Sequence, residues 1–238
     1  MSGHSKWATI KRKKGAADAK RGQAFSKLSK TITVCAREGG TDPVMNFSLR
    51  LAIEKAKAAN MPKDNIERAI QKAAGTGEGG QLATAVYEAM GPGGVAIVIE
   101  ALTDNPNRTV TNVKNIVNKR GGNVEAKVLW MFERKGVAYV EDVAAISDWD
   151  SFELSLIDAG AEDIARSDDQ VRVISSVKDL KAVTDALTAS GLTVESAGIE
   201  YVAKNTTELS AEQEEKLQEM VEALEEDEDV NGVYTNAA

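Results

Sequence analysis

Residues 3–37 read GHSKWATIKRKKGAADAKRGQAFSKLSKTITVCAR, and this stretch decides how the chain is organised. Through Gly75 the chain holds 16 Lys and Arg but only 6 Asp and Glu, a net charge of +10. From Thr76 onward it holds 13 basic and 31 acidic residues, a net of −18, so the whole chain carries −8. A cationic head on an anionic body is typical of a protein that binds a polyanion through one module.

Residues 2 to about 20 of this head are expected to form a loosely ordered arm that orders when it binds phosphates. Four consecutive cations at positions 11–14 repel one another and bury no apolar surface. Binding to phosphates would release counterions. The cations expected to make these contacts are Lys6, Lys11, Arg12, Lys13, Lys14, Lys20 and Arg21. Trp7 would either stack on a base or pin the arm to the first helix, and both readings stay open.

A helix is predicted over about residues 23–38, because apolar residues recur there at helical spacing. The apolar stripe consists of Phe25, Leu28, Ile32 and Cys35. Lys27, Lys30 and Arg37 fall on the opposite face. Such a face is either simply solvated or a second phosphate-binding surface. We expect phosphate binding, because the face continues directly from the basic arm.

Two shorter helices complete a helical, nucleic-acid-binding head over residues 1–78. Thr41 and Asp42 read as an N-cap before Pro43, and a helix is expected from there to about residue 59. A third helix is predicted at about residues 63–74. The predicted core is thin and rich in alanine, so the head is expected to be only marginally stable alone.

The acidic body starts with the elements of an incomplete α+β domain at residues 82–134. Strands are predicted on either side of the glycines and proline at 91–94, followed by a helix that begins near Pro106. Residues 123–132 read as extended, with Trp130 expected in the core.

A second α+β domain is predicted at residues 135–202, where the pattern runs strand, helix, strand, strand, helix, strand. This is the ferredoxin-like order. Residues 203–238 then supply a helix and a strand, which cannot form a core by themselves. We therefore expect a three-domain α+β protein. Its middle domain is discontinuous, 82–134 plus 203–238, and the ferredoxin-like domain is inserted into it.

Two polar stretches of the body can be interpreted as sites. Arg108 and Thr109 would stand near the positive end of the helix after Pro106, which makes them possible phosphate contacts. The alternative, which we favour, is that residues 103–109 simply build the turn. The acidic run at 225–229 is expected to be a solvated face, because consecutive carboxylates at a helix end seldom converge on one ion.

The residues that common enzymes and metalloproteins need are missing. His4 and Cys35 are the only His and Cys, so they cannot form a Cys/His metal site or an internal disulfide. No phosphate-binding loop, dinucleotide fingerprint or G-x-S-x-G motif occurs. We expect no catalysis, cofactor, metal or small-molecule substrate. The chain shows no apolar run of ~20 residues and no signal peptide, so a cytoplasmic protein without a membrane partner is expected.

Several strings in the sequence resemble the YebC/PmpR family. They include GHSKW at 3–7, DAKRG at 18–22, AREGG at 36–40, LRLAIEKAKAANMPKDNIERAI at 49–70, YEAMGPGGVAIVIE at 87–100 and LTDNPNRT at 102–109. The resemblance covers essentially the whole chain. It implies a three-domain α+β protein without catalytic activity. Bacterial members are described as DNA-binding transcriptional regulators, whereas some relatives are linked to translation.

The expected function is that of a non-enzymatic, nucleic-acid-binding regulator of gene expression. Its partner would be DNA or, in the alternative reading as a translation factor, ribosomal RNA on the ribosome. Two other classes are an enzyme such as a nuclease and an adaptor that binds proteins through the acidic body. The nuclease reading lacks an identifiable constellation of carboxylates or histidines. The adaptor reading predicts that the protein pulls down its partners equally well after nuclease treatment.

Overall fold

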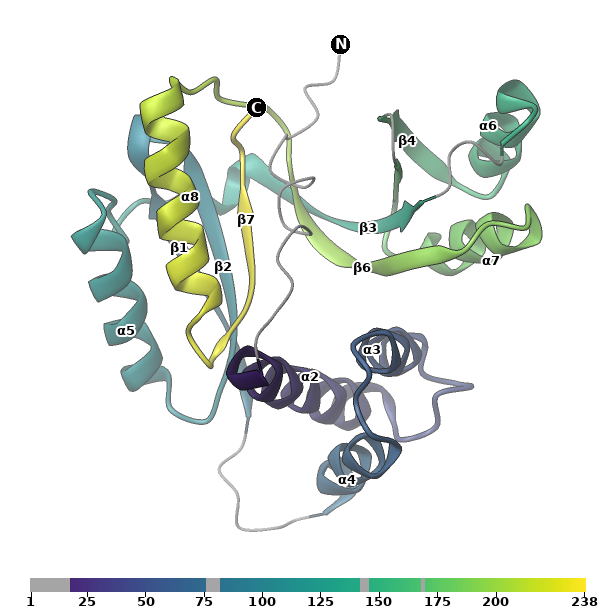
Figure 1. The fold of residues 1–238 in the computed structure, drawn as a ribbon, viewed down its shortest axis with the longest axis horizontal. Helices are drawn as coiled ribbons and strands as arrows, with labels where there is room; N and C mark the ends of the chain where they lie inside the picture. Colours follow the sequence, from purple (N-terminus) through teal and green to yellow (C-terminus); the bar gives the residue numbers. More distant parts are fainter. Residues whose placement is uncertain (1–17, 76–81, 142–145, 168–169) are drawn as a thin grey trace. The chain divides into compact units, whose positions relative to one another are not determined.

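The computed structural model describes residues 18–75, 82–141, 146–167 and 170–238, and Figure 1 shows their helices and strands. Contacts between residues divide the chain into two compact units. One comprises Met1–Phe132 with Ala203–Ala238, and the other comprises Glu133–Val202. Helices and two separate β-sheets confirm the expected α+β class. The further division of the first unit into a head and a middle domain remains a proposal.

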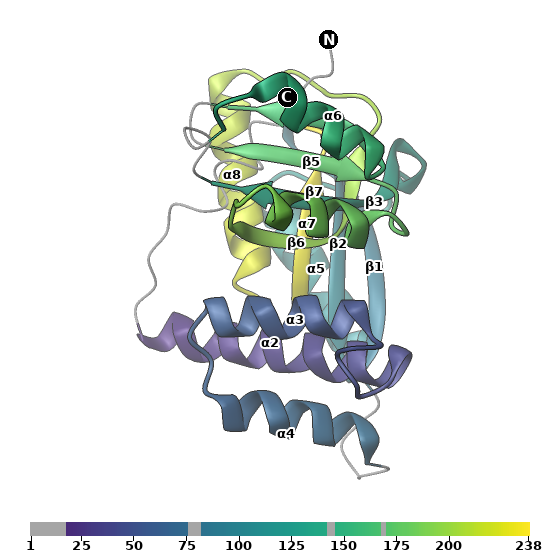
Figure 2. The same ribbon diagram turned by 90° about the vertical axis from the view of Figure 1, so that its right-hand side faces the viewer.

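The head consists of α2 (Asp18–Gly39), α3 (Phe47–Ala58) and α4 (Lys63–Ala74), which lie side by side in Figure 2. Its core is small and rich in alanine, as the sequence predicts. The buried residues are Leu28, Ile32, Ala36, Leu49, Ala52, Ala56, Met61, Ile66 and Ala69. Phe25 and Cys35 are partly buried against this core, which confirms the predicted apolar stripe.

The start of α3 differs from the prediction. The helix begins at Phe47 with Asn46 as its N-cap, and not at the Thr41–Pro43 stretch. The Asn46 side chain accepts a hydrogen bond from the Leu49 amide at 3.0 Å and donates to the carbonyls of Cys35 and Gly40, each at 2.8 Å. Asn46 therefore caps α3 and ties it to the end of α2, whereas Thr41 lies too far before Phe47 to cap the helix.

The middle part of the first unit is a three-stranded antiparallel sheet with the order β1-β2-β7. Its strands are β1 (Ala83–Met90), β2 (Ala96–Thr103) and β7 (Val230–Thr235), with η1 (Pro92–Gly94) between the first two. Helices α5 (Pro106–Lys119) and α8 (Ala211–Glu225) pack together against it (Figure 1). The C-terminal helix and strand thus share one core with the hairpin and α5.

The segment after α5 is not the extended strand that the sequence suggests. Asn123 forms only an isolated bridge with Met90, and Leu129–Met131 forms the short helix η2. The carboxylate of Glu88 accepts hydrogen bonds from two successive amides at this turn, at 2.6 and 2.7 Å. Trp130 projects outward and is 70% exposed, so its expected place in the core was wrong.

The second unit contains β3 (Phe132–Val140), α6 (Trp149–Asp158), β4 (Ala161–Arg166), β5 (Val171–Ser175), α7 (Leu180–Ala189) and β6 (Val194–Ala203). Its sheet has the order β4-β5-β3-β6. The first strand of the unit therefore lies between the third and the fourth, which is the ferredoxin-like arrangement. Both helices bury an apolar face, including Phe152 and Leu156 on α6 and Leu180, Val183 and Leu187 on α7.

Candidate nucleic-acid interface

The cations predicted to bind phosphates fall into three groups in the structure. Those of the arm, together with its tryptophan, lie outside the described residues: Lys6, Trp7, Lys11, Arg12, Lys13 and Lys14. Lys20 and Arg21 belong to the first turn of α2, and their side chains lie outside the described part of the chain. The third group, Lys27, Lys30 and Arg37, lies in the well-described part of α2, where Arg37 is exposed in the last turn.

Lys27 and Lys30 do not point into solvent but contact the segment that joins α8 to β7. The Lys27 ammonium donates a hydrogen bond to the carbonyl of Glu225. The Lys30 ammonium donates to the carbonyl of Glu228 at 3.0 Å and to the Asp229 carboxylate at 2.7 Å. One turn of α2 is therefore held by oxygen atoms of the acidic run 225–229, which we call the acidic segment.

Thr31 extends this contact by one more residue. Its hydroxyl lies 3.0 Å from the side-chain oxygen of Asn231, the second residue of β7, and donates to it. The Asn231 amide in turn donates to Glu100 on β2 at 2.9 Å.

Burial lowers the pKa of Lys27, and the nearby carboxylates of Glu225 and Asp227 act in the opposite direction. Lys27 is thus partly withdrawn from water by the same contact.

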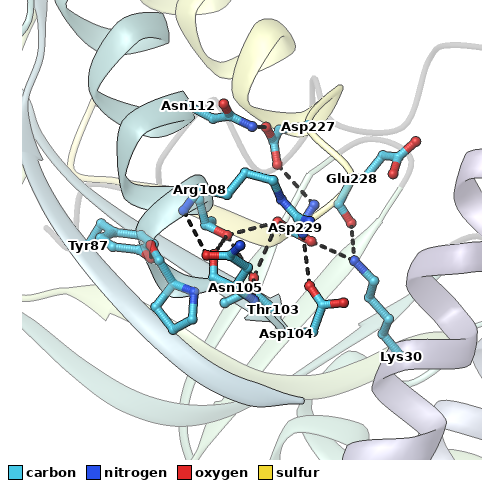
Figure 3. Close-up of polar contacts among 12 residues, drawn as sticks. Lys30, Tyr87, Thr103, Asp104, Asn105, Arg108, Asn112, Asp227, Glu228 and Asp229 are labelled. Carbon is cyan, nitrogen blue, oxygen red and sulfur yellow. Dashed lines mark hydrogen bonds and ion pairs between the residues drawn. The ribbon is translucent and has the colours of Figure 1, made fainter. Parts of the chain in front are cut away.

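Asp229 is the centre of the polar cluster in Figure 3. Its side chain is only 3% exposed. One oxygen accepts from Lys30, and the other accepts from Arg108 and Thr109, each at 2.8 Å, with the Thr103 hydroxyl at 3.3 Å. One buried carboxylate thereby joins α2, the β2–α5 turn and the start of β7.

The ionised form of Asp229 is strongly favoured by these donors. Burial by itself raises the pKa of the carboxyl group, because it disfavours the charge. Hydrogen bonds from Lys30, Arg108 and Thr109 outweigh that effect and lower the pKa of Asp229 from 3.8 to about 2. Asp229 is therefore a stable anion at neutral pH.

The β2–α5 turn supplies the other side of the cluster. Asn105 caps α5 by accepting from the amide of Arg108 at 3.1 Å, and Pro106 occupies the first turn. The Arg108 guanidinium lies between Asp229 and Asp104, at 2.8 and 3.0 Å. The hydrogen bond to Asp229 is the main cause of the raised pKa of Arg108. Residues 103–109 thus build the turn, and the anion at its helix end is Asp229.

Sequence reasoning missed the role of Asp229. The run 225–229 was expected to be a solvated face, and Glu226 and Glu228 are indeed exposed. Asp229 is buried because it directly precedes the buried strand β7, and its carbonyl accepts from the Leu102 amide on β2. The position next to an apolar strand start is the sequence signal that separates Asp229 from its neighbours.

The structure also adds exposed cations to the head that the sequence reasoning did not single out. They are Lys57 on α3 and Lys63, Arg68 and Lys72 on α4. Lys63 forms an ion pair with Glu67 at 3.4 Å, and Arg68 donates to Asn65 at 2.8 Å. Within the described part of the chain, neither Lys57 nor Lys72 forms an ion pair, so both are available to a phosphate.

The described residues offer little to support covalent or metal chemistry. Burial raises the pKa of the Cys35 thiol to about 11, which disfavours the reactive thiolate. Within residues 18–75, 82–141, 146–167 and 170–238, no group of three or more His, Cys, Asp and Glu could hold a metal ion. None of the described helices is long and apolar enough to cross a membrane.

Comparison with known proteins accounts for nearly the whole chain. The model of the TACO1/YebC N-terminal domain matches residues 5–76, and that of the TACO1/YebC second and third domain matches residues 82–237. Only residues 77–81 lie between the two matches. The head and the body therefore both follow the pattern of one family.

Similar full-length proteins come from several bacteria. A protein of Kosmotoga olearia is 50% identical over 99% of this chain and 94% of its own length. One of Desulforamulus reducens is 45% identical over 99% of this chain and 98% of its own length. Both are named probable transcriptional regulatory proteins. The crystal structure of the conserved hypothetical protein Aq1575 from Aquifex aeolicus superposes with a TM-score of 0.87 at 40% identity, covering 98% of this chain and 97% of that one. The chain belongs to the TACO1/YebC family, which confirms the resemblance seen in its sequence.

Proposed function

We propose that this protein is a non-enzymatic regulator of gene expression that binds nucleic acid through its basic head. The observation that carries the proposal is the division of charge, +10 through Gly75 and −18 after it. A phosphate backbone attracts the first part and repels the second, so it would bind the chain in one orientation. The names of the relatives support a role in regulation, and we place that role in the cytoplasm.

The cations available for such binding are those of the arm and the exposed cations of the three helices. In the described part of the head the exposed set includes Arg37, Lys57, Arg68 and Lys72. Lys27 and Lys30 are occupied by the acidic segment in this structure. Arg108 and Thr109 would contact a phosphate only if Asp229 moved away. We therefore assign first contact to the arm, where Trp7 would stack on a base.

Binding of this kind would be selective for charge and shape more than for sequence. Phosphate contacts position a protein on nucleic acid without reading its bases. The head offers no clear pattern of Asn, Gln and Arg at a helix start, the arrangement that reads base edges in the major groove. We expect weak preference among DNA sequences and a strong dependence of affinity on salt.

The acidic body favours a second candidate, a translation factor that binds ribosomal RNA. A long duplex extends on both sides of the head and would repel a body of net charge −18. A folded RNA surface with protein neighbours would let the head dock while the body faces away. DNA and the ribosome are therefore the two targets that the experiment must separate.

Sedimentation of a cell lysate through a density gradient at near-physiological salt separates the two targets. The intact protein is compared with a variant in which residues 11–14 are alanine. Co-migration of only the intact protein with ribosomes would support translation. Absence from ribosomes, together with protection of one discrete promoter sequence against excess competitor DNA, would support transcription. If neither occurs, and if the purified protein also fails to bind both DNA and RNA, the proposed function is wrong.

A further inference from the structure

The contact between α2 and the acidic segment has the chemistry of a contact between a protein and a phosphate backbone. Over one turn of α2, Lys27, Lys30 and Thr31 donate hydrogen bonds. The partners are all oxygen atoms from the segment 225–231, and one of them belongs to the ionised carboxylate of Asp229 while the others are neutral. A nucleic-acid strand also presents a row of oxygen acceptors to a basic helix, and its phosphate oxygens are all anionic.

We propose that the segment 225–231 is a built-in competitor that occupies the α2 cations until nucleic-acid phosphates displace it. This inference rests on the proposed function, since it assumes that the ligand is a phosphate backbone. It adds that the contact is autoinhibitory. Nucleic acid that is first held by the arm would take over Lys27 and Lys30 only by releasing the acidic segment.

Separate apolar cores make such a release possible. Among the described residues, the core of the head is formed by residues from Leu28 to Ala69, and the residues packed against it come from 25–73. Within the same described part of the chain, the core of the middle domain is formed by residues from 89–117 and 217–237, and the residues packed against it come from the same domain. Neither apolar core has to open when the polar contact breaks.

Asp229 would also keep partners after the release. Its second carboxylate oxygen still accepts from Arg108 and Thr109, each at 2.8 Å. Loss of Lys30 therefore does not leave an unpaired buried charge. Lys30, whose side chain retains 21% exposure, would exchange one anion for another. The exchange replaces one charge-assisted hydrogen bond by another of the same kind.

Two variants weaken the contact from opposite sides. Asp229→Asn removes the negative charge next to Lys30. Thr31→Val removes the hydroxyl that contacts Asn231 while keeping the shape of the side chain and the charge of both surfaces. The control is Asp185→Asn on α7, which changes the net charge as Asp229→Asn does, but at an exposed ion pair with Lys181 in the other unit.

Binding to a 20-base-pair duplex and to a structured RNA is measured over a range of salt concentrations. Relative to the Asp185→Asn control, Asp229→Asn should bind several-fold more tightly. Its slope of log K against log salt should steepen by about 1 to 2, because Lys30 and Arg108, the two cations paired with Asp229, become available to phosphates. Thr31→Val should also bind more tightly than the wild type. Equal or weaker binding by both variants would overturn the proposal.

Amide hydrogen exchange of the wild-type protein separates this inference from the proposed function. If nucleic acid displaces the segment, adding the duplex should speed exchange at residues 225–231. Binding without faster exchange at these residues contradicts the competition but leaves the proposed function intact. If neither the wild type nor the Asp229→Asn and Thr31→Val variants bind either nucleic acid, both the competition and the proposed function are wrong.

Discussion

Lys30 and Asp229 form an ion pair of 2.7 Å although they lie 199 positions apart in the sequence. The lysine belongs to the basic head and the aspartate to the acidic body, so the pair joins the two oppositely charged parts of the chain. Asp229 is 3% exposed and also binds Arg108 and Thr109. A change at this one carboxylate should therefore affect both the stability of the protein and the freedom of α2.

The first prediction is that Asp229→Asn destabilises the first unit by about 2 kcal/mol at neutral pH. The value follows from the low pKa of Asp229, because each pKa unit between the folded and unfolded states corresponds to about 1.4 kcal/mol. Urea unfolding measures the effect. The control is Asp104→Asn, which removes a half-exposed partner of Arg108 and should cost less than about 1 kcal/mol. Equal losses in the two variants would contradict the central place given to Asp229.

The second prediction is that the stabilising effect of Asp229 disappears at low pH. The pKa of Asp229 is lower in the folded protein than in the unfolded chain, so its contribution is complete above about pH 4 and is lost as the pH falls through about 2. The stability difference between wild type and Asp229→Asn should therefore shrink as the pH falls from 6 toward 2. Taking the difference between the two proteins cancels the effects of all other carboxylates. A difference that stays constant over this range would show that the carboxylate charge is not what stabilises the fold.

Sequence reasoning predicted the elements of this fold better than its long-range contacts. Local spacing was enough for α2, and the order of strands and helices was enough for the ferredoxin-like unit. The pair of Lys30 and Asp229 was out of reach, because no local pattern links positions so far apart. The cap of α3 was misplaced for a related reason, since Asn46 is selected by its contacts with α2.

Trp130 shows the limit of arguing from residue type alone. A large aromatic residue between predicted strands is usually buried, whereas here it is 70% exposed. The turn that holds it depends on Glu88, which accepts from the amides of Val128 and Leu129. Neither the turn nor the carboxylate that fixes it can be recognised without the pairing of β1 with its neighbours.

The third prediction is that residues 82–135 do not fold without residues 203–238. β7 pairs with β2 in the sheet, and α8 supplies Leu217, Met220, Val221 and Leu224 to the shared core. Far-ultraviolet circular dichroism and urea unfolding of the two fragments, alone and mixed, test this. The fragment 133–202, which forms its own compact unit, should unfold cooperatively by itself. Cooperative unfolding of the isolated 82–135 fragment would refute the discontinuous middle domain.

The fourth prediction is that Cys35 reacts slowly in the folded protein. Burial raises the pKa of its thiol to about 11, so very little thiolate exists at pH 8. Reaction with a thiol-specific dye should be slow in buffer and fast in denaturant. Rapid reaction of the native protein would contradict this prediction and show that the fold does not protect the thiol. Comparison with Asp229→Asn shows whether release of α2 alone changes the rate.

The measurement that tests the proposed function most directly is the salt dependence of nucleic-acid binding. Wild type is compared with the variant in which Lys11, Arg12, Lys13 and Lys14 are alanine. A matched control replaces four exposed cations of the body, Lys114, Lys178, Lys181 and Lys216, by alanine. If the arm binds phosphates, the slope of log K against log salt falls by about 3 in the arm variant and stays nearly unchanged in the control. An unchanged slope in the arm variant would contradict the assignment of first contact to the arm.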